Sequence, residues 1–324
     1  MTQTLIPTRA PAGTQVVSVK GLRVRYGETV AVDGVSLSIG RGEIFGILGP
    51  NGAGKTTTVE CIAGLRRAEA GTIEVLGLNP QEDRDELRNR VGVQLQAAQL
   101  PDKLRVVEAL QLFASFYANP DDPERLLELL GLPSKRDTRF SSLSGGQRQR
   151  LSIALALIGR PELAILDELT TGLDPQARRE TWKLIEQVRD EGVTVILVTH
   201  FMEEAERLCD RLALLHHGRV IAIDTPAALA TGAVGRQSIS FRPSRPLELE
   251  SIQQLPGVSE VSEHGGRLTV AGSGDLIATV IEELVRRQVI PEQTRVEQST
   301  LDDAFVALTA DADGADHPQD EEPR

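Results

Sequence analysis

Short apolar runs and amphipathic segments alternate through the middle of the chain. The runs at 44–48, 163–166 and 193–198 contain almost no polar side chains, which is typical of strands buried on both faces of a sheet. Residues 56–65 and 176–190 have the composition and spacing of helices, and the second repeats apolar positions at three- and four-residue intervals. We therefore expect an α/β fold in which strands and helices alternate.

Two regions depart from this alternation. Residues 16–39 form short segments of alternating apolar and polar positions, joined by glycine-containing turns, which predicts an antiparallel β region. Residues 106–117 and 123–130 have helical spacing and indicate a helical insert at about 97–150. Single strands are expected at 71–75 and 91–96.

The pattern changes again from residue 236, where a small α+β unit is predicted. Its strands are expected at 238–241, 257–262, 267–271 and 295–298, and its helices at 247–255, 274–288 and 300–308. Residues 1–15 have no periodicity and residues 310–324 are acidic, so both are expected to be disordered tails. The predicted organisation is thus a main domain over 16–235 and an accessory domain over 236–309.

Composition narrows the classes of function. The 324 residues carry a formal net charge of −12 and are 40% hydrophobic. No apolar run approaches the roughly 18–20 residues that span a bilayer, and the N-terminus lacks a signal-peptide pattern, so a cytoplasmic protein is expected. The sequence shows no basic patch of the kind that binds nucleic acid. The negative net charge also opposes direct binding to an anionic membrane. Cys61 and Cys209 lack metal-ligand spacing and are expected to be reduced core residues.

A glycine-rich segment, Gly49-Pro50-Asn51-Gly52-Ala53-Gly54-Lys55-Thr56-Thr57, lies between a predicted strand and a predicted helix. Glycines let consecutive backbone N–H groups point inward at anionic oxygens, and the following helix adds its positive N-terminus. Lys55 would hold the β- and γ-phosphates of a nucleotide, and Thr56 would offer its hydroxyl to Mg²⁺. The alternative is a glycine-rich turn without a ligand.

Acidic and histidine side chains follow two other predicted strands. Asp167 and Glu168 end the run at 163–166, and His200 follows the run at 193–198. Ligands of open α/β sheets bind beyond such strand ends. Asp167 could bind Mg²⁺, and Glu168 could orient or deprotonate an attacking water. The alternatives are a solvated strand end and a structural histidine.

Two further features have both structural and functional interpretations. Ser144-Gly145-Gly146-Gln147 precedes a long helical pattern and could be a second anion-binding helix start. Taken alone, a plain helix N-cap explains it better, although two copies of the chain could use two such starts. Tyr26 could stack on adenine or be an ordinary core or surface aromatic residue.

These motifs together resemble the ATP-binding cassette (ABC) family, specifically its nucleotide-binding subunits, over about residues 16–230. The family's motifs occur in its own order: the A-loop at Tyr26, Walker A at 49–57, the Q-loop at Gln96, the signature at 143–147, Walker B at Asp167-Glu168, the D-loop at 173–174 and the H-loop at His200. The resemblance implies a P-loop NTPase with a RecA-like core.

The same resemblance implies the ligands and partners. ATP and Mg²⁺ are the expected cofactors, and two copies pair head to tail, so that Ser144, Gly145, Gly146 and Gln147 cap the nucleotide of the partner. Gln96 would touch Mg²⁺ or the attacking water and sense a permease. Asp174 would link the two sites, and His200 would hold the γ-phosphate. The chain would work on the inner face of the cell membrane, through a separate integral membrane permease.

The C-terminal stretch 299–309 looks like the tail of cassettes that serve daunorubicin-type drug efflux. The resemblance therefore implies an exporter ATPase, with drugs or antibiotics as the expected cargo and lipid, polysaccharide or a cofactor as alternatives. A non-transport cassette in translation or DNA repair is a different class, which the single cassette and the absence of coiled-coil arms oppose. A nucleotide-gated module without turnover is opposed by the presence of Glu168 and His200. One departure from the family pattern is Leu169, where proline is usual.

Overall fold

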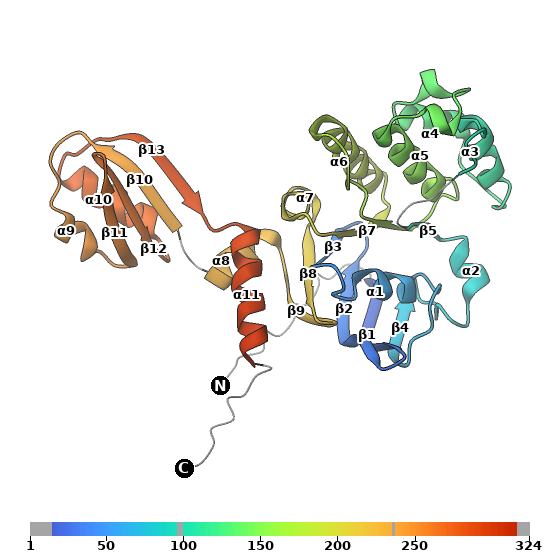
Figure 1. The fold of residues 1–324 in the computed structure, drawn as a ribbon, viewed down its shortest axis with the longest axis horizontal. Coiled ribbons are helices and arrows are strands. Elements are labelled where there is room, and N and C mark those ends of the chain that lie inside the picture. The colour runs from blue at the N-terminus through green and yellow to red at the C-terminus, as the bar shows by residue number, and fades with distance from the viewer. Residues whose placement is uncertain (1–14, 96–99, 235–236, 316–324) are drawn as a thin grey trace, which may run out of the picture. The chain divides into compact units, whose positions relative to one another are not determined.

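The computed structural model describes residues 15–95, 100–234 and 237–315. Contacts divide the chain into two units, Met1–Pro226 and Ala227–Arg324, whose elements are labelled in Figure 1. Each unit has its own hydrophobic core. The helix α8 (Pro226–Val234) stands at the junction. The boundary predicted from the sequence, after residue 235, follows this helix instead of preceding it.

A six-stranded sheet forms the middle of the first unit. Its order is β5-β6-β7-β3-β8-β9, with strands at Val91–Gln94, Leu163–Asp167, Thr194–Thr199, Ile44–Leu48, Arg211–His216 and Arg219–Asp224. All neighbouring strands are parallel except β8 and β9. Every residue of β3, β6 and β7 is buried, which explains their continuous apolar runs. The predicted α/β core is confirmed.

A second, three-stranded antiparallel sheet has the order β2-β1-β4. Its strands are β1 (Gln15–Tyr26), β2 (Thr29–Gly40) and β4 (Ala70–Val75). The sequence pattern predicts several short strands here, and that prediction is wrong: β1 and β2 are continuous. Gly21 adopts φ 59°, and the pairing of β1 with β2 changes register between Val19 and Leu22. This glycine therefore makes a bulge inside the pair and does not end a strand.

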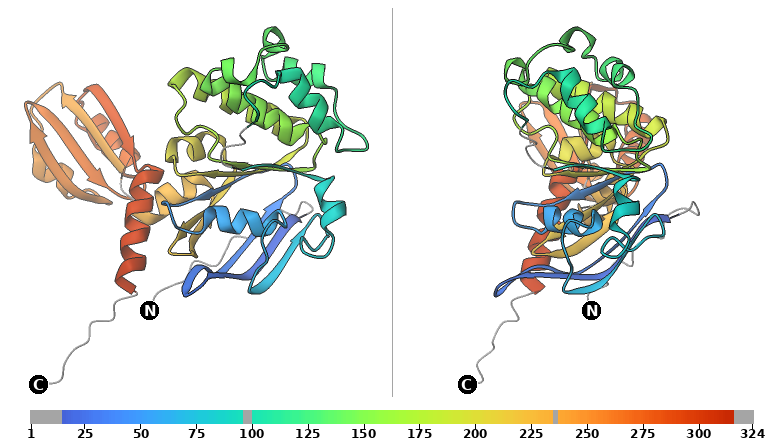
Figure 2. Two further views of the ribbon diagram at one scale, coloured as in Figure 1. Left: turned by 45° about the vertical axis from the view of Figure 1, so that its right-hand side comes forward. Right: turned by 90° about the vertical axis from the view of Figure 1, so that its right-hand side faces the viewer.

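Helices cover both faces of the six-stranded sheet. The helix α1 (Lys55–Ile62) packs between this sheet and the antiparallel one, and its residues share their hydrophobic core. Figures 1 and 2 show the green helices on the opposite face. These comprise α3 (Val106–Ala114), α4 (Pro123–Leu129), α5 (Gly145–Leu157) and α6 (Pro175–Asp190). The short helix α2 (Arg84–Arg88) was not predicted from the sequence. The other short helix, α7 (Met202–Leu208), ends just before Cys209, which lies in a helical sequence pattern.

The second unit contains the strand–helix sequence β10-α9-β11-β12-α10-β13. The elements are β10 (Gln237–Pro243), α9 (Leu249–Gln253), β11 (Val258–His264), β12 (Arg267–Gly272), α10 (Leu276–Arg286) and β13 (Pro291–Gln298). They form an antiparallel sheet of order β11-β12-β10-β13. The core joins Phe241 and Val270 of the sheet to Ile252 of α9 and Val280 of α10.

The last helix, α11 (Leu301–Ala315), is longer than predicted. The sequence pattern ends this helix at residue 308 and assigns disorder from residue 310. Alanines at 310, 312 and 315 have the highest helix propensity of any residue type, which accounts for the extension. The predicted tail residues 1–14 and 316–324 lie outside the described residues.

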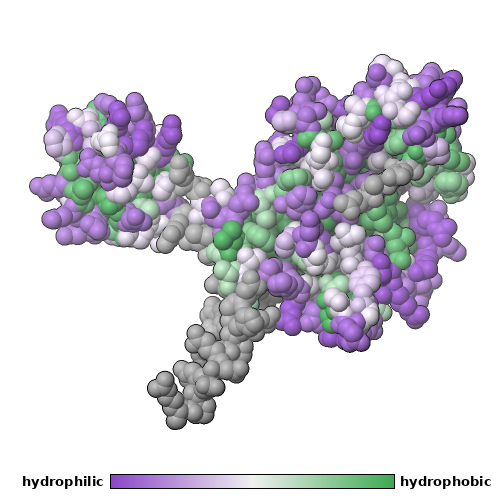
Figure 3. Space-filling model, in the orientation of Figure 1, coloured by the Kyte–Doolittle hydropathy of each residue, from purple (hydrophilic) through white to green (hydrophobic). Residues whose placement is uncertain are grey.

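The polarity of the surface and the burial of the two cysteines agree with what the amino-acid composition predicts. The visible surface of each unit is mostly hydrophilic, with small hydrophobic areas between (Figure 3). Across the described ranges, no helix combines the length and apolar character that crossing a membrane requires. Cys61 and Cys209 are buried free thiols, as predicted, and burial raises the pKa of Cys61 to about 11.

Candidate functional site

The glycine-rich loop connects β3 to α1, and two of its glycines cannot be replaced without a clash. A Cβ at Gly49 would lie 2.2 Å from the carbonyl oxygen of Leu215, and one at Gly54 would lie 2.5 Å from that of Ala31. Gly54 also has φ 93°, a left-handed conformation that disfavours side chains. Gly54 is the N-cap of α1, and no side chain caps this helix start. The first N–H groups of α1 are thus left for another acceptor.

Lys55 is the first residue of α1, and its ammonium group turns back over the loop. Its Nζ donates to the carbonyl oxygens of Gly49 at 2.8 Å and Pro50 at 3.0 Å. Burial lowers the pKa of Lys55, while the carboxylates of Glu168 and Asp167 act in the opposite direction. The positive charge is therefore held at the loop and next to two acids.

Thr56 and Asp167 join the loop to the end of β6. The Thr56 hydroxyl donates to Oδ2 of Asp167 over 3.1 Å. Asp167 is only 1% exposed, and burial raises its pKa, partly opposed by the hydrogen bond from Thr56. Its other oxygen, Oδ1, is buried without a hydrogen-bond partner.

A divalent cation fits this pair of oxygen ligands. A P-loop threonine and the aspartate of the neighbouring strand are the two protein ligands that hold Mg²⁺ in P-loop NTPases. The buried Oδ1 of Asp167 is an acceptor that such an ion would satisfy. Within the part of the chain that the structure describes, no cluster of three or more acidic, histidine or cysteine side chains offers a metal site made of protein ligands alone. Mg²⁺ held by few side chains and by phosphate oxygens is consistent with this.

Glu168 and His200 meet beyond the ends of β6 and β7. The Nδ1 of His200 lies 3.3 Å from Oε1 of Glu168. Parallel pairing places Asp167 opposite Val198 and Thr199 opposite Leu48, so all three chain segments leave the sheet at one edge. Glu168 has φ 49°, a conformation that costs free energy in a residue other than glycine. The turn aims its carboxylate out of the strand.

A cavity of about 420 Å³ lies between these groups. Its lining includes Ala31, Asn51, Gly52, Gly54, Lys55, Thr56, Thr57 and Glu168. Its volume lies within the range of small-molecule sites, and it combines a helix N-terminus, a lysine and an acid.

Gln94, which the sequence reasoning did not single out, is buried beside this site. Its side-chain oxygen accepts the backbone N–H of Asp167 over 3.2 Å, and its amide donates to the Leu95 carbonyl at 3.0 Å. The sequence feature that could have identified Gln94 is the presence of a glutamine inside an otherwise apolar run. The predicted Gln96 lies outside the described residues.

The segment predicted as a second phosphate-binding helix start caps α5. The Ser144 hydroxyl accepts the N–H of Gln147 at 3.3 Å, and the Gln147 side chain accepts the N–H of Ser144 at 3.0 Å. A Cβ at Gly146 would lie 2.9 Å from Cβ of Ala177, so this glycine lets α5 approach α6. None of these residues, nor Gly145, is among those that line the cavity of the same chain.

Asp174 caps a helix, whereas Tyr26 contacts a residue that lines the cavity. The Asp174 carboxylate caps α6 by accepting the N–H groups of Gln176 and Ala177, both at 2.9 Å. Tyr26 lies next to the loop: its hydroxyl is 3.2 Å from the hydroxyl of Thr57, and either group could donate. The residue is 44% exposed, so its ring is accessible.

Leu169, the departure from the pattern of the resembled family, is fully buried. It follows the left-handed Glu168 directly. Its burial extends the buried run of β6 beyond Glu168.

Comparisons with known proteins point to one family. A family model described as "ABC transporter" matches residues 32–171. "Nod factor export ATP-binding protein I" of Ralstonia nicotianae is 45% identical over 304 residues, which cover 91% of this chain and 94% of the relative. The protein of the same name from a Rhizobium species is 38% identical, with 90% and 96% coverage.

Solved structures match about two thirds of the chain. The ATP-binding subunit of an ABC transporter matches with a TM-score of 0.61 and 29% identity, covering 67% of this chain and 92% of that one. A dimeric ATP-binding cassette bound to ADP and Pi after hydrolysis matches with a TM-score of 0.59 and 28% identity, covering 64% and 98%. The predicted P-loop NTPase fold is confirmed.

Proposed function

Because the chain belongs to the ATP-binding subunits of the ABC transporter family, and is an ATPase of that family, we propose that two copies hydrolyse Mg-ATP at shared sites and drive a separate permease that exports a compound. One observation carries the chemistry: Lys55, the Thr56–Asp167 hydrogen bond and the Glu168–His200 contact all adjoin one cavity. This set combines phosphate binding, cation ligands and a carboxylate for water.

Each side chain has a distinct part in the proposed reaction. Lys55 leaves the carbonyl groups of Gly49 and Pro50 and holds the β- and γ-phosphates as a point charge. Thr56 and Asp167 would hold Mg²⁺, which neutralises charge on the phosphate oxygens when bound. Glu168 orients a water and accepts its proton as the water attacks the γ-phosphorus, and the bond to the β–γ bridging oxygen breaks. His200 holds the Glu168 carboxylate and the γ-phosphate.

We further propose that Tyr26 stacks on adenine and that Ser144 and Gly146 face the γ-phosphate of the partner chain. The exposed ring of Tyr26 and its bond to Thr57 support the first assignment. The separation of the α5 start from the cavity of its own chain supports the second. A dimeric relative bound to ADP and Pi adds to it. Asp174, next to the start of α6, would connect the two sites, and Gln96 would contact the permease.

Export is supported by relatives that cover most of this chain and are named as Nod factor export ATP-binding proteins. The resemblance to daunorubicin-type cassettes implies a drug cargo, whereas these names refer to Nod factor export. We therefore propose that the transporter exports its cargo, and we do not assign drugs as that cargo. Through the permease, the protein would work at the inner face of the membrane.

Phosphate release by the purified chain tests the proposal. Hydrolysis should require Mg²⁺ and should be lost in Lys55→Ala, with circular dichroism unchanged. Co-expression with a permease gene should then yield a detergent-extracted complex whose ATPase activity responds to the cargo. A folded wild-type complex without Mg-dependent hydrolysis would refute the assignment.

A further inference from the structure

Arg66 lies over the ring of Tyr26, and neither the motifs nor the proposed chemistry explain this. The guanidinium carbon of Arg66 is 4.6 Å from the ring centroid, within the range of a cation–π interaction. Arg66 follows the end of α1, far from Tyr26 in the sequence. The contact therefore joins the end of β1 to the segment after α1.

Arg66 is itself held at several points. Its Nε donates to Oε2 of Glu60 over 2.6 Å, and its backbone N–H donates to the carbonyl of Glu60 at 3.1 Å. Its carbonyl oxygen accepts from the side-chain amide of Gln81 at 2.7 Å. Arg66 is thus a fixed support and not a freely rotating surface side chain.

Tyr26 is consequently held at two places. Its hydroxyl contacts Thr57, which lines the cavity, and its ring lies under Arg66. Tyr26, Arg66 and its anchor Glu60 all lie outside the cavity lining. The guanidinium covers one face of the ring, and Tyr26 stays 44% exposed with Arg66 in place, which leaves the other face for a ligand.

We propose that Arg66 is a positioning residue for ATP, which holds Tyr26 so that the free face of its ring stacks on adenine. The inference rests on the proposed function, which gives Tyr26 the adenine. A ring that is held before binding loses less conformational freedom when the base arrives. Because Arg66 contacts the ring and does not line the cavity, its removal should weaken binding of the base and leave binding of the phosphates nearly unchanged.

Steady-state kinetics of the full chain test this. Arg66→Ala should raise KM for Mg-ATP about 3–10-fold, with kcat within about twofold. Inorganic tripolyphosphate, a competitive inhibitor that has no base, should keep its inhibition constant. Arg66→Lys should be intermediate, because lysine keeps the charge without the planar group. The matched control is Arg67→Ala, which removes the same charge from an exposed neighbour.

A double-mutant cycle separates this inference from the proposed function. Tyr26→Ala should raise KM, and adding Arg66→Ala to it should change KM no further. If Tyr26→Ala leaves KM unchanged, the adenine assignment fails and the inference with it. If Tyr26→Ala raises KM but Arg66→Ala does not, only the role of Arg66 is overturned. A lower KM in Arg66→Ala, or an equal change in the tripolyphosphate constant, also overturns it.

Discussion

His200 and Glu168 face each other across the ends of β7 and β6, with Nδ1 and Oε1 3.3 Å apart. Thirty-two positions separate them in the chain, and the parallel register of β6 and β7 brings them together. The contact holds a carboxylate whose backbone is already in a left-handed conformation. Two independent constraints thus determine where this carboxylate points.

Glu168→Gln should bind ATP with nearly wild-type affinity and lose turnover by at least about 100-fold. The amide keeps the size of the side chain and its contact with His200, but it cannot accept a proton from water. Phosphate release and ATP titration measure the two effects, and ATP-dependent dimers should accumulate in gel filtration. Near-normal steady-state hydrolysis would show that Glu168 lacks this role.

Asp167→Asn should stabilise the protein without ligands at neutral pH, by on the order of 1 kcal/mol or roughly 2–4 °C in Tm. Burial raises the pKa of Asp167 above its ordinary value, so ionising this group favours the unfolded state. The stability that protonated Asp167 gives the folded state is fully present below the pKa of this group in the unfolded chain. That stability is lost as the pH rises through the pKa of Asp167 in the folded protein. The gain of the variant should therefore shrink on acidification towards the ordinary pKa of an aspartate, 3.8.

Mg-ATP should reverse this order of stabilities. The ligand stabilises the state that binds it, so Mg-ATP should raise the Tm of the wild type more than that of Asp167→Asn. Thermal unfolding with EDTA, and then with Mg-ATP, makes both comparisons on the same samples. A variant less stable than the wild type in EDTA at neutral pH would contradict the cost assigned to the buried carboxylate.

Mixed dimers test the shared sites. Gly146→Asp would crowd Ala177, so Ser144→Asp is the better lesion, since aspartate caps a helix as serine does. Its charge would repel the γ-phosphate bound by the partner chain, at a cost on the order of a few kcal/mol. Lys55→Ala and Ser144→Asp homodimers should be inactive. Their mixed dimer should recover up to about half of the wild-type activity if the two sites act independently.

Ser144→Asn is the control for this experiment, because it keeps the cap without the charge. Its homodimer should retain more activity than that of Ser144→Asp. Mixed dimers should be purified with two different tags and assayed with their permease. Inactive mixed dimers that bind ATP at the intact site would count against independent shared sites.

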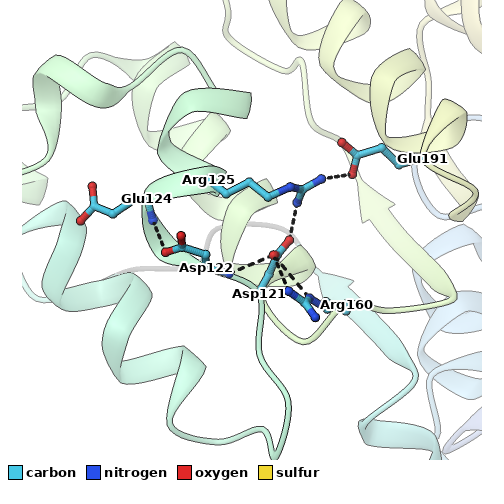
Figure 4. A network of polar contacts seen from close by, with 6 residues as sticks. All are labelled: Asp121, Asp122, Glu124, Arg125, Arg160 and Glu191. Carbon is cyan, nitrogen blue, oxygen red and sulfur yellow. Dashed lines mark hydrogen bonds and ion pairs between the residues drawn. The ribbon is translucent and has the colours of Figure 1, made fainter.

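A polar network joins α4 to the end of α6 and to the residue Arg160 (Figure 4). The carboxylate of Asp121, whose side chain is 8% exposed, binds Arg125 and Arg160, and Arg125 also bonds Glu191 at 2.6 Å. Asp121→Asn should lower the free energy of unfolding by about 1–3 kcal/mol, because two cations lose a buried partner. Urea denaturation measures this loss.

The adjacent Asp122 provides the matched control. Asp122 is the N-cap of α4 and accepts the N–H of Glu124 at 3.0 Å. Asparagine caps about as well as aspartate, so Asp122→Asn should change stability by less than about 0.5 kcal/mol. Equal effects of the two variants would show that the network adds nothing beyond removal of a charge.

A chain truncated after residue 235 should still bind ATP, within about a factor of ten in affinity, or 1.4 kcal/mol. Every residue that lines the cavity precedes residue 226, and each unit has a core of its own. Transport with the permease is expected to need residues 236–309. Fluorescence titration of the folded truncated chain checks the first point, and absence of ATP binding would show that the second unit contributes to the site.

The sequence alone was sufficient for the features that depend on local order. Glycines in the 49–54 segment, followed by Lys55 and Thr56, specify a phosphate loop, because the same few residues provide the turn, the N–H groups and the charge. Apolar runs predicted the buried strands β3, β6 and β7, since burial on both faces requires them. The order of the motifs along the chain was enough to identify the ABC family.

Only the tertiary structure decided which distant groups meet and how each is used. Strand pairing aligned Leu48 with Thr199 and Asp167 with Val198, which no local pattern encodes. The register of β1 and β2 places a bulge at Gly21. Packing of distant segments brings Gln94 within hydrogen-bond distance of the Asp167 backbone and the Arg66 guanidinium over the ring of Tyr26. The physical reason is that a side chain's partners depend on long-range packing, whereas its turn or helix depends mainly on its neighbours in the chain.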